Sequence, residues 1–369
     1  MDGGSGGESS GMRSLTAFAH PYNKTITMAA IAKAAGVSQG AISSLLNDRD
    51  YGIRVSEKTR KKVFKACRDL GYIPNDLRAV VRMYPELGDL CVLVSNSVRD
   101  WPVDPFYSRI LKGAMAAISS PAHHLTLARY EDGTDYLEHP ELLPHPIHSG
   151  IASKFICIGN MNFSLLQALL RRDFPVALLG CEVSIPGVTT VQADCAEAAR
   201  IGIDYLLKLG HRNIAVLSGQ FGSTDNCIME LNRGIRLSLE RVEIDFDPQN
   251  IIHGDLSFES GAAAMDVLFA RPHKPTAIFG LSDEAAAGAV SRAATMGINV
   301  PVQLSVLGCS GNAPAVSMGL TTLHIPAEDM GAEAVKDLES RVQKGILSGS
   351  RKIVLPVKLV ERNTCAAAQ

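Results

Sequence analysis

Short continuous apolar runs alternate with amphipathic stretches of helical period along most of this chain, from residue 89 onward. The apolar runs are Leu90–Val94, Phe155–Ile158, Val176–Leu179, Ile214–Leu217, Ala277–Leu281 and Leu304–Leu307. The helical stretches lie near 106–119, 163–172, 194–209, 228–241, 258–270, 283–296 and 327–344. Continuous apolar strands separated by helices are typical of a parallel sheet covered on both faces. Because the pattern is too long for one small sheet, we expect two α/β lobes.

A different, all-helical pattern fills residues 25–72. Thr27, Ser38 and Ser56 stand where side-chain oxygens cap helix N-termini, each just before an apolar stripe. Gly36 ends the first of these stripes. The third stripe lies opposite a basic face made of Lys58, Arg60, Lys61, Lys62, Lys65 and Arg68. The pattern predicts a compact block of three helices.

Basic residues are concentrated in this helical head. Between Arg13 and Arg82 there are 13 Lys and Arg against 5 Asp and Glu, whereas the remainder has 23 against 33. A basic head on an acidic body points to a polyanion as the partner of the head alone. On charge alone, a solvated charged surface remains the alternative.

The segment from Thr27 to Asn47 has the spacing of a helix-turn-helix. Gly36 permits the left-handed backbone of a tight turn, and Val37 is placed to fill the angle between the two helices. The second helix leaves small or amide-bearing side chains unburied, namely Gln39, Gly40, Ser43 and Ser44. Such side chains suit contact with base edges in a major groove. A plain helical hairpin with polar outer residues is the alternative, and the basic third helix favours DNA.

These residues resemble the DNA-binding headpiece of the lac repressor (LacI/GalR) family. The matches are Ile31-Ala32, Ala35-Gly36-Val37-Ser38, Ile42-Ser43, Leu46-Asn47, Val55-Ser56, Thr59-Arg60, Val63, Leu70-Gly71-Tyr72 and Pro74-Asn75. Their order and spacing make the match highly specific. The chain departs from the family pattern by extra residues within Asp48–Arg54, where we expect a longer loop.

The resemblance implies a double-stranded DNA operator as partner and assigns residues to it. Base reading falls on the second helix, at Gln39, Gly40 and Ser44, and phosphate contacts fall on Thr27, Asn47, Ser56, Lys58 and Thr59. The implied DNA-binding set is Thr27, Ser38, Gln39, Gly40, Ala41, Ser43, Ser44, Asn47, Ser56, Lys58 and Thr59. Ser44 stands where an arginine is common, so we expect direct readout to rest on Gln39 and Ser43.

Residues 75–82 match the family's hinge helix, which opens the minor groove with an apolar wedge. Asn75 and Arg78 fall on this segment, and Val81 occupies the wedge position where leucine is usual. A smaller wedge implies a shallower kink in the DNA. A simple linker is the alternative for this segment.

The body resembles the family over its whole length and implies a two-lobed fold like that of periplasmic sugar-binding proteins. The matches include Asp104-Pro105-Phe106-Tyr107, Leu209-Gly210-His211-Arg212, Ser305-Val306-Leu307-Gly308 and Leu355-Pro356-Val357. We expect a flexible tail, a helix-turn-helix domain, a hinge with linker, and a body, at residues 1–23, 24–73, 74–87 and 88–369. Lobe one is predicted at about 88–191 and 324–350, and lobe two at about 192–323 and 351–362.

The resemblance places an effector between the lobes. Phe106 and Tyr107 match aromatic residues that stack on a sugar, and Asp283 keeps an acidic position that binds hydroxyls. Elsewhere the usual polar ligand-binding residues are replaced, by Gly180, Leu231, Leu256, Ser282 and Ser310. Losing these partners would leave a hexose with unpaired polar groups. The hypothesis is therefore an unusual or less polar effector, sugar-related in class, or no effector.

No other motif supports a different chemistry. The eight cysteines form no C-x-x-C pair, so we expect reduced, buried thiols in a cytoplasmic protein and no metal or cofactor. His139, His145 and His148 lie in a proline-rich stretch that we interpret as a solvated loop, and His211 follows Gly210, where it is expected to cap a helix. No catalytic set is placed by any motif, so we do not expect an enzyme. No apolar run is long enough to span a membrane.

The sequence thus predicts a sequence-specific transcriptional regulator, a repressor controlled by a small molecule. Helix-turn-helix proteins that read two half-sites are symmetric dimers, so we expect a homodimer on a pseudo-palindromic operator. The alternative is a solute-binding sensor whose DNA-binding head is degenerate.

Overall fold

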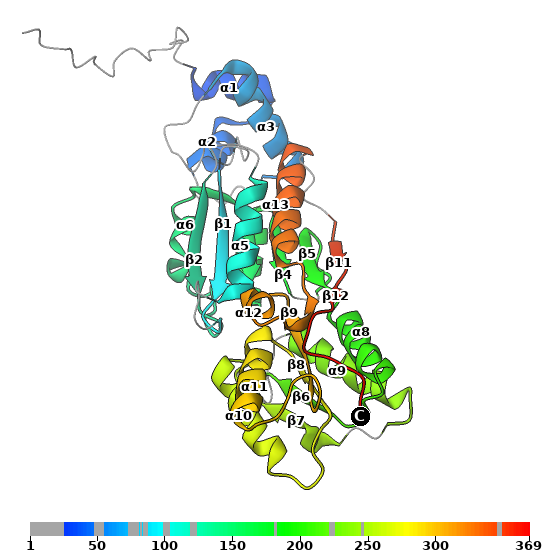
Figure 1. The fold of residues 1–369 in the computed structure, drawn as a ribbon. Coiled ribbons are helices and arrows are strands. Elements are labelled where there is room, and N and C mark those ends of the chain that lie inside the picture. The colour runs from blue at the N-terminus through cyan, green and yellow to red at the C-terminus, as the bar shows by residue number, and fades with distance from the viewer. Residues whose placement is uncertain are drawn as a thin grey trace, which may run out of the picture. The chain divides into compact units, whose positions relative to one another are not determined.

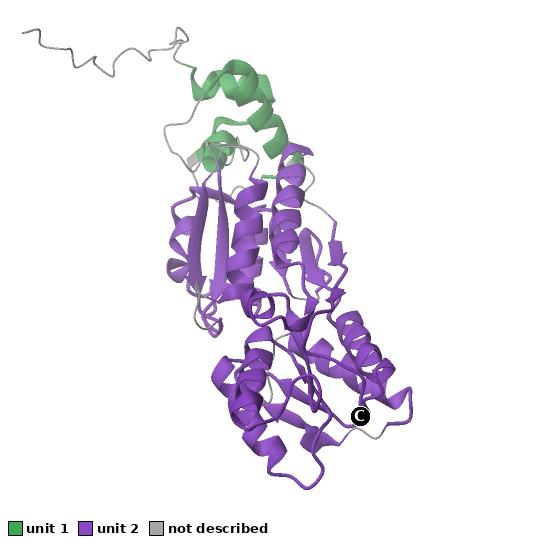
Figure 2. Cartoon of the chain, viewed as in Figure 1, with its two compact units in different colours: residues 1–83 green, residues 84–369 purple. Residues whose placement is uncertain are grey.

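The computed structural model describes residues 26–47, 55–72, 81, 83, 88–98, 104–118, 124–180, 183–220, 226–244, 247–344 and 349–369. The chain divides into two compact units, residues 1–83 and 84–369 (Figure 2). None of the helices within the described residues is both long and apolar enough to cross a membrane.

Among the described residues of the first unit lie the helices α1 (Met28–Ala35), α2 (Gln39–Asn47) and α3 (Glu57–Leu70). Each begins at a predicted cap: the hydroxyl oxygens of Thr27, Ser38 and Ser56 accept hydrogen bonds from the backbone three residues on, at 3.2 Å in each case. Gly36 ends α1 in the left-handed conformation, with φ 66°. The predicted caps and the glycine turn are therefore confirmed.

The core of this unit joins all three helices. Its most buried side chains are Ile31 of α1, Ile42 and Leu46 of α2, and Val63 and Cys67 of α3. The three stripes read from the sequence therefore meet in one apolar centre, which fixes the polar face of α2 outward.

The second unit contains two six-stranded sheets (Figure 1). The first sheet has the order β11-β5-β4-β3-β1-β2 and is parallel throughout. Its strands are β1 (Asp89–Ser95), β2 (Leu125–Tyr130), β3 (Ala152–Ile158), β4 (Val176–Leu179), β5 (Val188–Ala193) and β11 (Arg351–Leu355). The second sheet has the order β12-β10-β9-β8-β6-β7, and only its edge strand β12 is antiparallel to its neighbour. Its strands are β6 (Ile214–Ser218), β7 (Ile251–His253), β8 (Ala277–Gly280), β9 (Ser305–Ser310), β10 (Thr321–His324) and β12 (Lys358–Val360).

Helices cover both faces of each sheet, as the continuous apolar strands predict. On the first sheet, α5 (Pro105–Ala117) and α13 (Ala327–Lys344) share a core with one face, and α6 (His145–His148) and α7 (Phe163–Leu170) share a core with the other. On the second sheet the corresponding helices are α8 (Cys195–Lys208) and α9 (Asn226–Glu240), and α10 (Phe258–Phe269) and α11 (Asp283–Thr295). The short α12 (Ala313–Ser317) follows β9. The two-lobed α/β prediction is confirmed.

The chain crosses between the lobes three times. It crosses after β5, between β10 and α13, and between β11 and β12. The expected crossing near Arg351 is wrong, because β11 still pairs with β5 in the first sheet. The chain leaves that sheet only after Leu355, where Pro356 and Val357 separate the two strands.

Helices α5 and α13 lie side by side and approach closely at glycines (Figure 1). A Cβ on Gly113 would lie 1.8 Å from the backbone oxygen of Glu328, and one on Gly331 would lie 2.0 Å from that of Ile110. Since a main-chain atom cannot rotate away as a side chain can, only glycine fits at these positions.

Replacing Gly113 with alanine is therefore expected to lower the free energy of unfolding by about 3 kcal/mol, as overpacking does. Urea denaturation would measure the loss. Gly133→Ala is the matched control, because a Cβ there meets nothing within 4 Å. Equal stability of the two variants would contradict the close helix contact.

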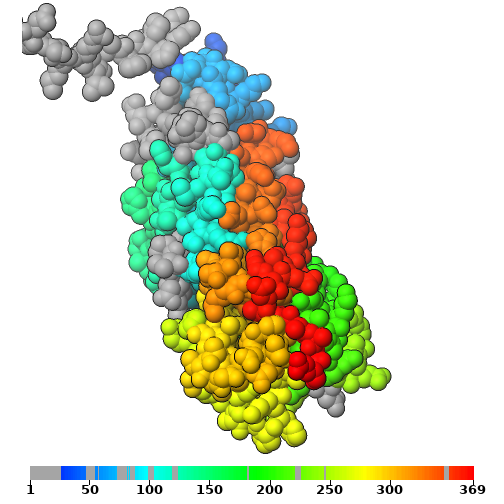
Figure 3. Space-filling model, viewed as in Figure 1, coloured from blue at the N-terminus to red at the C-terminus, as the bar shows by residue number. Residues whose placement is uncertain are grey.

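The C-terminal segment packs against the second lobe, where it is red in Figure 3. The His211 side chain contacts this segment, because its Nε2 lies 3.0 Å from the backbone oxygen of Ala366. The same Nε2 lies 2.9 Å from Ser305 Oγ, and Nδ1 lies 3.0 Å from Thr276 Oγ1. The backbone N–H of His211 also donates to Leu206 at the end of α8, which confirms the predicted cap.

Burial lowers the pKa of His211 below its usual value. The unfolded chain then binds more protons than the folded chain, so stability should fall as the pH drops below about 6.5, the pKa of an unperturbed histidine. Urea midpoints measured between neutral and mildly acidic pH would show this. Burial also lowers the pKa of His324, so a His211→Gln variant is needed as reference. If the difference in urea midpoint between the unaltered protein and the His211→Gln variant did not shrink as the pH falls, the contribution assigned to neutral His211 would be wrong.

Candidate DNA-binding and ligand sites

The polar face of α2 is the candidate surface for reading bases. Gln39 and Gly40 are exposed at its first turn, and Ser43 and Ser44 are half-buried one turn further along. Ala41 does not belong to this face: only 7 % of its surface is exposed. Contact between Ala41 and DNA therefore stays a prediction, and it requires a change in packing because the methyl group of Ala41 lies among the three helices.

The N-termini of α1, α2 and α3 present hydrogen-bond donors suited to phosphates. At each one a single hydroxyl caps one N–H, and the other first-turn N–H groups remain available to an anion. Ser56 Oγ also lies 2.8 Å from Thr59 Oγ1, and Lys58 beside them is exposed. This arrangement fits the phosphate role predicted for these residues. Of the other predicted contacts, Asn47 ends α2, whereas Asn75 and Arg78 lie outside the described residues.

The predicted wedge, Val81, is helical and buried, with 4 % of its surface exposed. A side chain that inserts between base steps must be exposed to the DNA. The wedge role of Val81 therefore stays a prediction, and it requires that the side chain be uncovered when DNA binds.

A guanidinium from one lobe reaches the other at the candidate ligand site. Arg109 of α5 donates through Nη1 to the backbone oxygen of Ser310 at 2.9 Å and to Asn312 Oδ1 at 3.1 Å. Its Nη2 donates to the oxygen of Ile325, on the crossing segment, at 3.1 Å. The Nδ2 of Asn312 then donates to Glu284 at 3.2 Å. One continuous hydrogen-bonded chain thus links α5 to the carboxyl ends of the second sheet.

Asp283 lies inside this region and is fully buried. Thr322 Oγ1 donates to it at 2.5 Å and the backbone N–H of Asn312 donates at 2.6 Å. Burial raises the pKa of Asp283 in spite of these bonds, and it raises the pKa of Glu284 too, with the charges of Asp283 and Asp104 adding to the effect. The Asp283 carboxylate, which is predicted to bind a ligand, therefore already accepts hydrogen bonds from the Thr322 hydroxyl and the Asn312 backbone.

The other predicted ligand residues divide into two groups. Phe106 and Tyr107 follow Asp104, whose carboxylate accepts from both of their N–H groups, and they are half-buried near the site. Gly180, with φ 75°, has open space where a Cβ would stand. Leu231 is different, because its side chain is buried in the core against which α9 packs, so its contact with an effector stays a prediction that would require a change in packing.

Ser282 and Leu256 bind each other rather than projecting freely. The hydroxyl of Ser282 donates to the backbone oxygen of Leu256 at 2.7 Å and also accepts from the N–H of Ala285 as the cap of α11. Leu256 has a left-handed backbone, with φ 65°. Ser310 is buried, and Arg109 donates to its backbone oxygen rather than to its side chain.

An open pocket of about 540 Å³ lies beyond the carboxyl ends of β6 and β7. It is lined by Gln220, His253, Gly254, Asp255, Ser257, Glu259 and Ser260. None of the predicted effector residues lines it, although Leu256 lies between two that do. Ligands of open α/β sheets bind outside the carboxyl ends of the strands, which is where this pocket lies.

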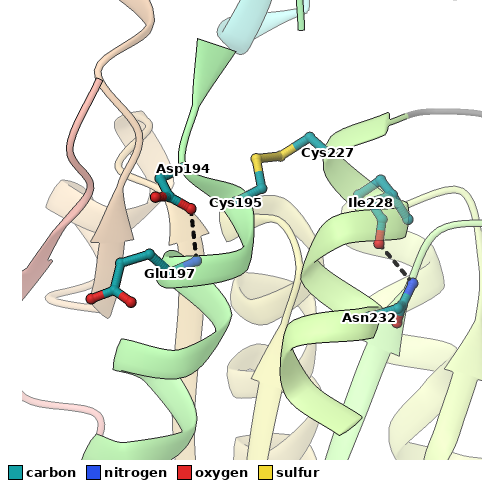
Figure 4. The surroundings of a disulfide bond; sticks show 6 residues. All are labelled: Asp194, Cys195, Glu197, Cys227, Ile228 and Asn232. Atoms are coloured by element: carbon teal, nitrogen blue, oxygen red, sulfur yellow. Dashed lines mark hydrogen bonds between the residues drawn. A yellow bond between two sulfur atoms is a disulfide. The ribbon is translucent and has the colours of Figure 1, made fainter. Parts of the chain in front are cut away.

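Two cysteines correct the expectation of reduced thiols throughout. Cys195 and Cys227 form a disulfide with a Cα–Cα distance of 5.5 Å (Figure 4). The thiols that the structure describes elsewhere are Cys67, Cys91, Cys157, Cys309 and Cys365. No motif marked the pair, because its members stand 32 residues apart and meet only through the packing of α8 against α9.

Sequence reasoning also missed Arg109, Asn312 and Glu284. Arg109 lies in the turn after Phe106 and Tyr107, so its place on the same helix was the available signal. Glu284 directly follows the predicted residue Asp283, whereas Asn312 had no local signal, because it reaches Arg109 through a contact distant in sequence.

Comparisons with known proteins agree with this architecture. Residues 27–75 match the model of the bacterial regulatory proteins of the lacI family, and residues 203–365 match a periplasmic binding protein-like domain. The HTH-type transcriptional regulator DegA of Bacillus subtilis is 30% identical over 90% of this chain and 96% of its own length. The HTH-type transcriptional repressor CytR of Escherichia coli is 30% identical over 92% of this chain and 96% of its own length.

A solved structure of the transcriptional regulator CelR with cellobiose aligns with a TM-score of 0.64 and 26% identity. The alignment covers 92% of this chain and 99% of that one. The helix-turn-helix head, the two parallel-sheet lobes and full-length relatives together exclude an enzyme as the family function. The chain belongs to the LacI family and is a DNA-binding transcriptional regulator.

Proposed function

We propose that this regulator represses transcription as a cytoplasmic homodimer on a pseudo-palindromic operator, and that a small ligand between its lobes changes its operator affinity. The observation that carries the proposal is the exposed polar face of α2, held outward by the buried side chains of α1 and α3. A symmetric dimer presents two such faces to adjacent major grooves.

The ligand is proposed to be sugar-related but not a plain hexose. The cellobiose complex of CelR supports the class. Phe106 and Tyr107 offer aromatic surface, whereas Asp283 and Ser282 already bind the protein's own groups. Arg109, Asn312 and Glu284 are further polar groups at the site, and hydrogen bonds join them to one another. An effector that fits would carry hydroxyl groups able to replace the bonds between these three side chains.

Selection of the purified protein against random DNA duplexes tests the first part. Enrichment of a palindrome without ligand establishes an operator-specific regulator. Failure to enrich any sequence, with or without candidate ligands, would instead support the alternative of a solute-binding sensor with a degenerate head.

Calorimetry against a panel of monosaccharides and disaccharides tests the second part. Tight binding of a common hexose would contradict the proposed ligand class, since Gly180 and Ser310 stand where the family pattern has acidic residues. Binding should be lost in a Phe106→Ala variant, where the aromatic surface is removed.

A further inference from the structure

The disulfide lies where the chain passes between the lobes. Cys195 is the first residue of α8, directly after Asp194, whose N–H donates to Leu355 at the end of β11. Asp194 and Leu355 therefore both lie where the chain leaves a strand of the first lobe and crosses to the second lobe. Cys227 is the second residue of α9, so the bond joins a crossing to the start of the helix that follows β6 (Figure 4).

The bodies of α8 and α9 do not depend on this bond. Gly234 lets the helices approach so closely that a Cβ would lie 2.7 Å from Ala199 Cβ and 2.8 Å from the oxygen of Ala196. Leu231 and Ile235 add buried apolar contacts from α9. The disulfide adds a covalent restraint at the first turn of α9, where Ile228 packs against the apolar core and its backbone oxygen accepts from Asn232 Nδ2, which also donates to Ser218 Oγ.

This first turn lies on the ligand side of the second lobe. Ser218 ends β6, and the pocket beyond the carboxyl ends of β6 and β7 begins at Gln220. Asn232 binds Ser218 Oγ at 2.9 Å. Two hydrogen bonds of Asn232 thus connect the first turn of α9, at Ile228, to Ser218, which lies two residues before Gln220 of the pocket.

The position of the pair favours thiol exchange at Cys227, whereas Cys195 is buried. Both cysteines lie in the first turn of a helix, where the positive end of the dipole favours a thiolate. Cys227 is only half-buried. By contrast, burial raises the pKa of Cys67 to about 11 and that of Cys91 and Cys365 to about 12, which keeps those thiols protonated and unreactive.

We infer that Cys195 and Cys227 form a reversible thiol–disulfide couple that locks and releases the first turn of α9, and so couples operator affinity to redox state. The link to operator affinity rests on the proposed function. Disulfides in proteins that work in a reducing compartment are usually transient and redox-sensing, and a DNA-binding regulator works in such a compartment.

The chemistry is thiol–disulfide exchange with a dithiol reductant. A thiolate of the dithiol attacks the more exposed sulfur of Cys227, the bond between the two cysteines breaks, and Cys195 leaves as a thiolate that takes up a proton. The second thiol of the reductant then displaces Cys227, which is protonated in turn. The protein gains two electrons and two protons, and the reductant becomes a disulfide. Reoxidation by the disulfide of a small thiol runs the same steps in reverse.

The test equilibrates the full-length protein in glutathione buffers from fully reduced to fully oxidised, alkylates the thiols and weighs the intact chain. Both states should be populated within this range, with a mass step of two alkyl groups that is absent from a Cys195→Ser/Cys227→Ser variant. If reduced glutathione did not reduce the bond, the proposal of a reversible couple would be wrong, and the disulfide would have a structural role only.

Hydrogen exchange of the two forms supplies the second measurement. Reduction should speed exchange of the amides of residues 230–232, which donate to the carbonyl groups of the first turn of α9, by at least about tenfold while the rest of α8 and α9 stays protected. A Cys365→Ser variant is the matched control and should behave as the unaltered protein does. Equal protection in both redox states would overturn the release of the turn.

Operator binding is measured last, on the selected duplex in both redox states. A several-fold difference that disappears in the double serine variant is expected, and equal affinities would overturn the regulatory role. If no operator is found, the proposed function fails, whereas the mass and exchange measurements still decide the couple.

Discussion

Replacing Gln39 with alanine is expected to reduce the preference for the operator over unrelated DNA about 10- to 100-fold, which corresponds to about 1–3 kcal/mol for one side chain that pairs with a base edge. Gln39 is exposed on the first turn of α2, the turn that enters the major groove in helix-turn-helix proteins. Its neighbour Gly40 has no side chain, and Ser43 and Ser44 are short, so the amide of Gln39 is the longest polar group on this face. Competition binding with specific and random duplexes would measure the loss.

Lys58→Ala is the matched control for this experiment. Lys58 is exposed at the start of α3, and a phosphate contact there carries no sequence information. Its loss should weaken binding to all duplexes about equally and reduce the dependence of log affinity on log salt by about one. If Gln39→Ala behaved in the same way, the amide would be contacting the backbone and base reading would have to lie elsewhere on α2.

The sequence predicts those inner strands that are continuous apolar runs. β1, β3, β4, β6, β8 and β9 are continuous apolar runs inside the sheets, and each was found. β2 was missed because it lies at an edge, where Arg129 and other polar residues interrupt the run. β5 was missed because Thr189 and Thr190 interrupt its apolar run, although both are buried.

The helical head was predictable because its signals are local. A cap, a stripe and a glycine turn lie within a few residues of one another, and Thr27 and Gly36 act as their positions suggest. The ligand site was less predictable because its contacts are distant. Asp283 is bound by Thr322, 39 residues away, and no local pattern shows that this partner will take the place of a ligand hydroxyl. The same reason hid the disulfide.

Replacing Arg109 with alanine is expected to lower the free energy of unfolding of the body by about 2–4 kcal/mol and to favour separated lobes. Hydrogen bonds made by a charged group contribute about 1.5–3 kcal/mol each, and they do not add fully when they share one side chain. Arg109 makes three of them, to Ser310, Asn312 and Ile325, and its side chain is only 17% exposed. Removing it also leaves the carbonyl groups that it satisfies without a donor.

Lys112→Ala, one turn further along α5, provides the comparison. Lys112 pairs with Glu328 at 3.1 Å but is 72% exposed, and exposed pairs contribute at most about 1 kcal/mol. Arg109→Lys should behave almost like Arg109→Ala, because an ammonium group cannot match a planar fork that bonds to diverging acceptors. Urea denaturation gives the energies, and small-angle scattering reports whether the lobes separate. If the alanine variants at 109 and 112 proved equally stable and equally compact, the guanidinium would not hold the lobes together. If only the Arg109 variant loses stability and compactness, the bonds of Arg109 hold the lobes together without a ligand. A ligand that enters this site must then replace those bonds, and the closed arrangement is the state that an effector has to change.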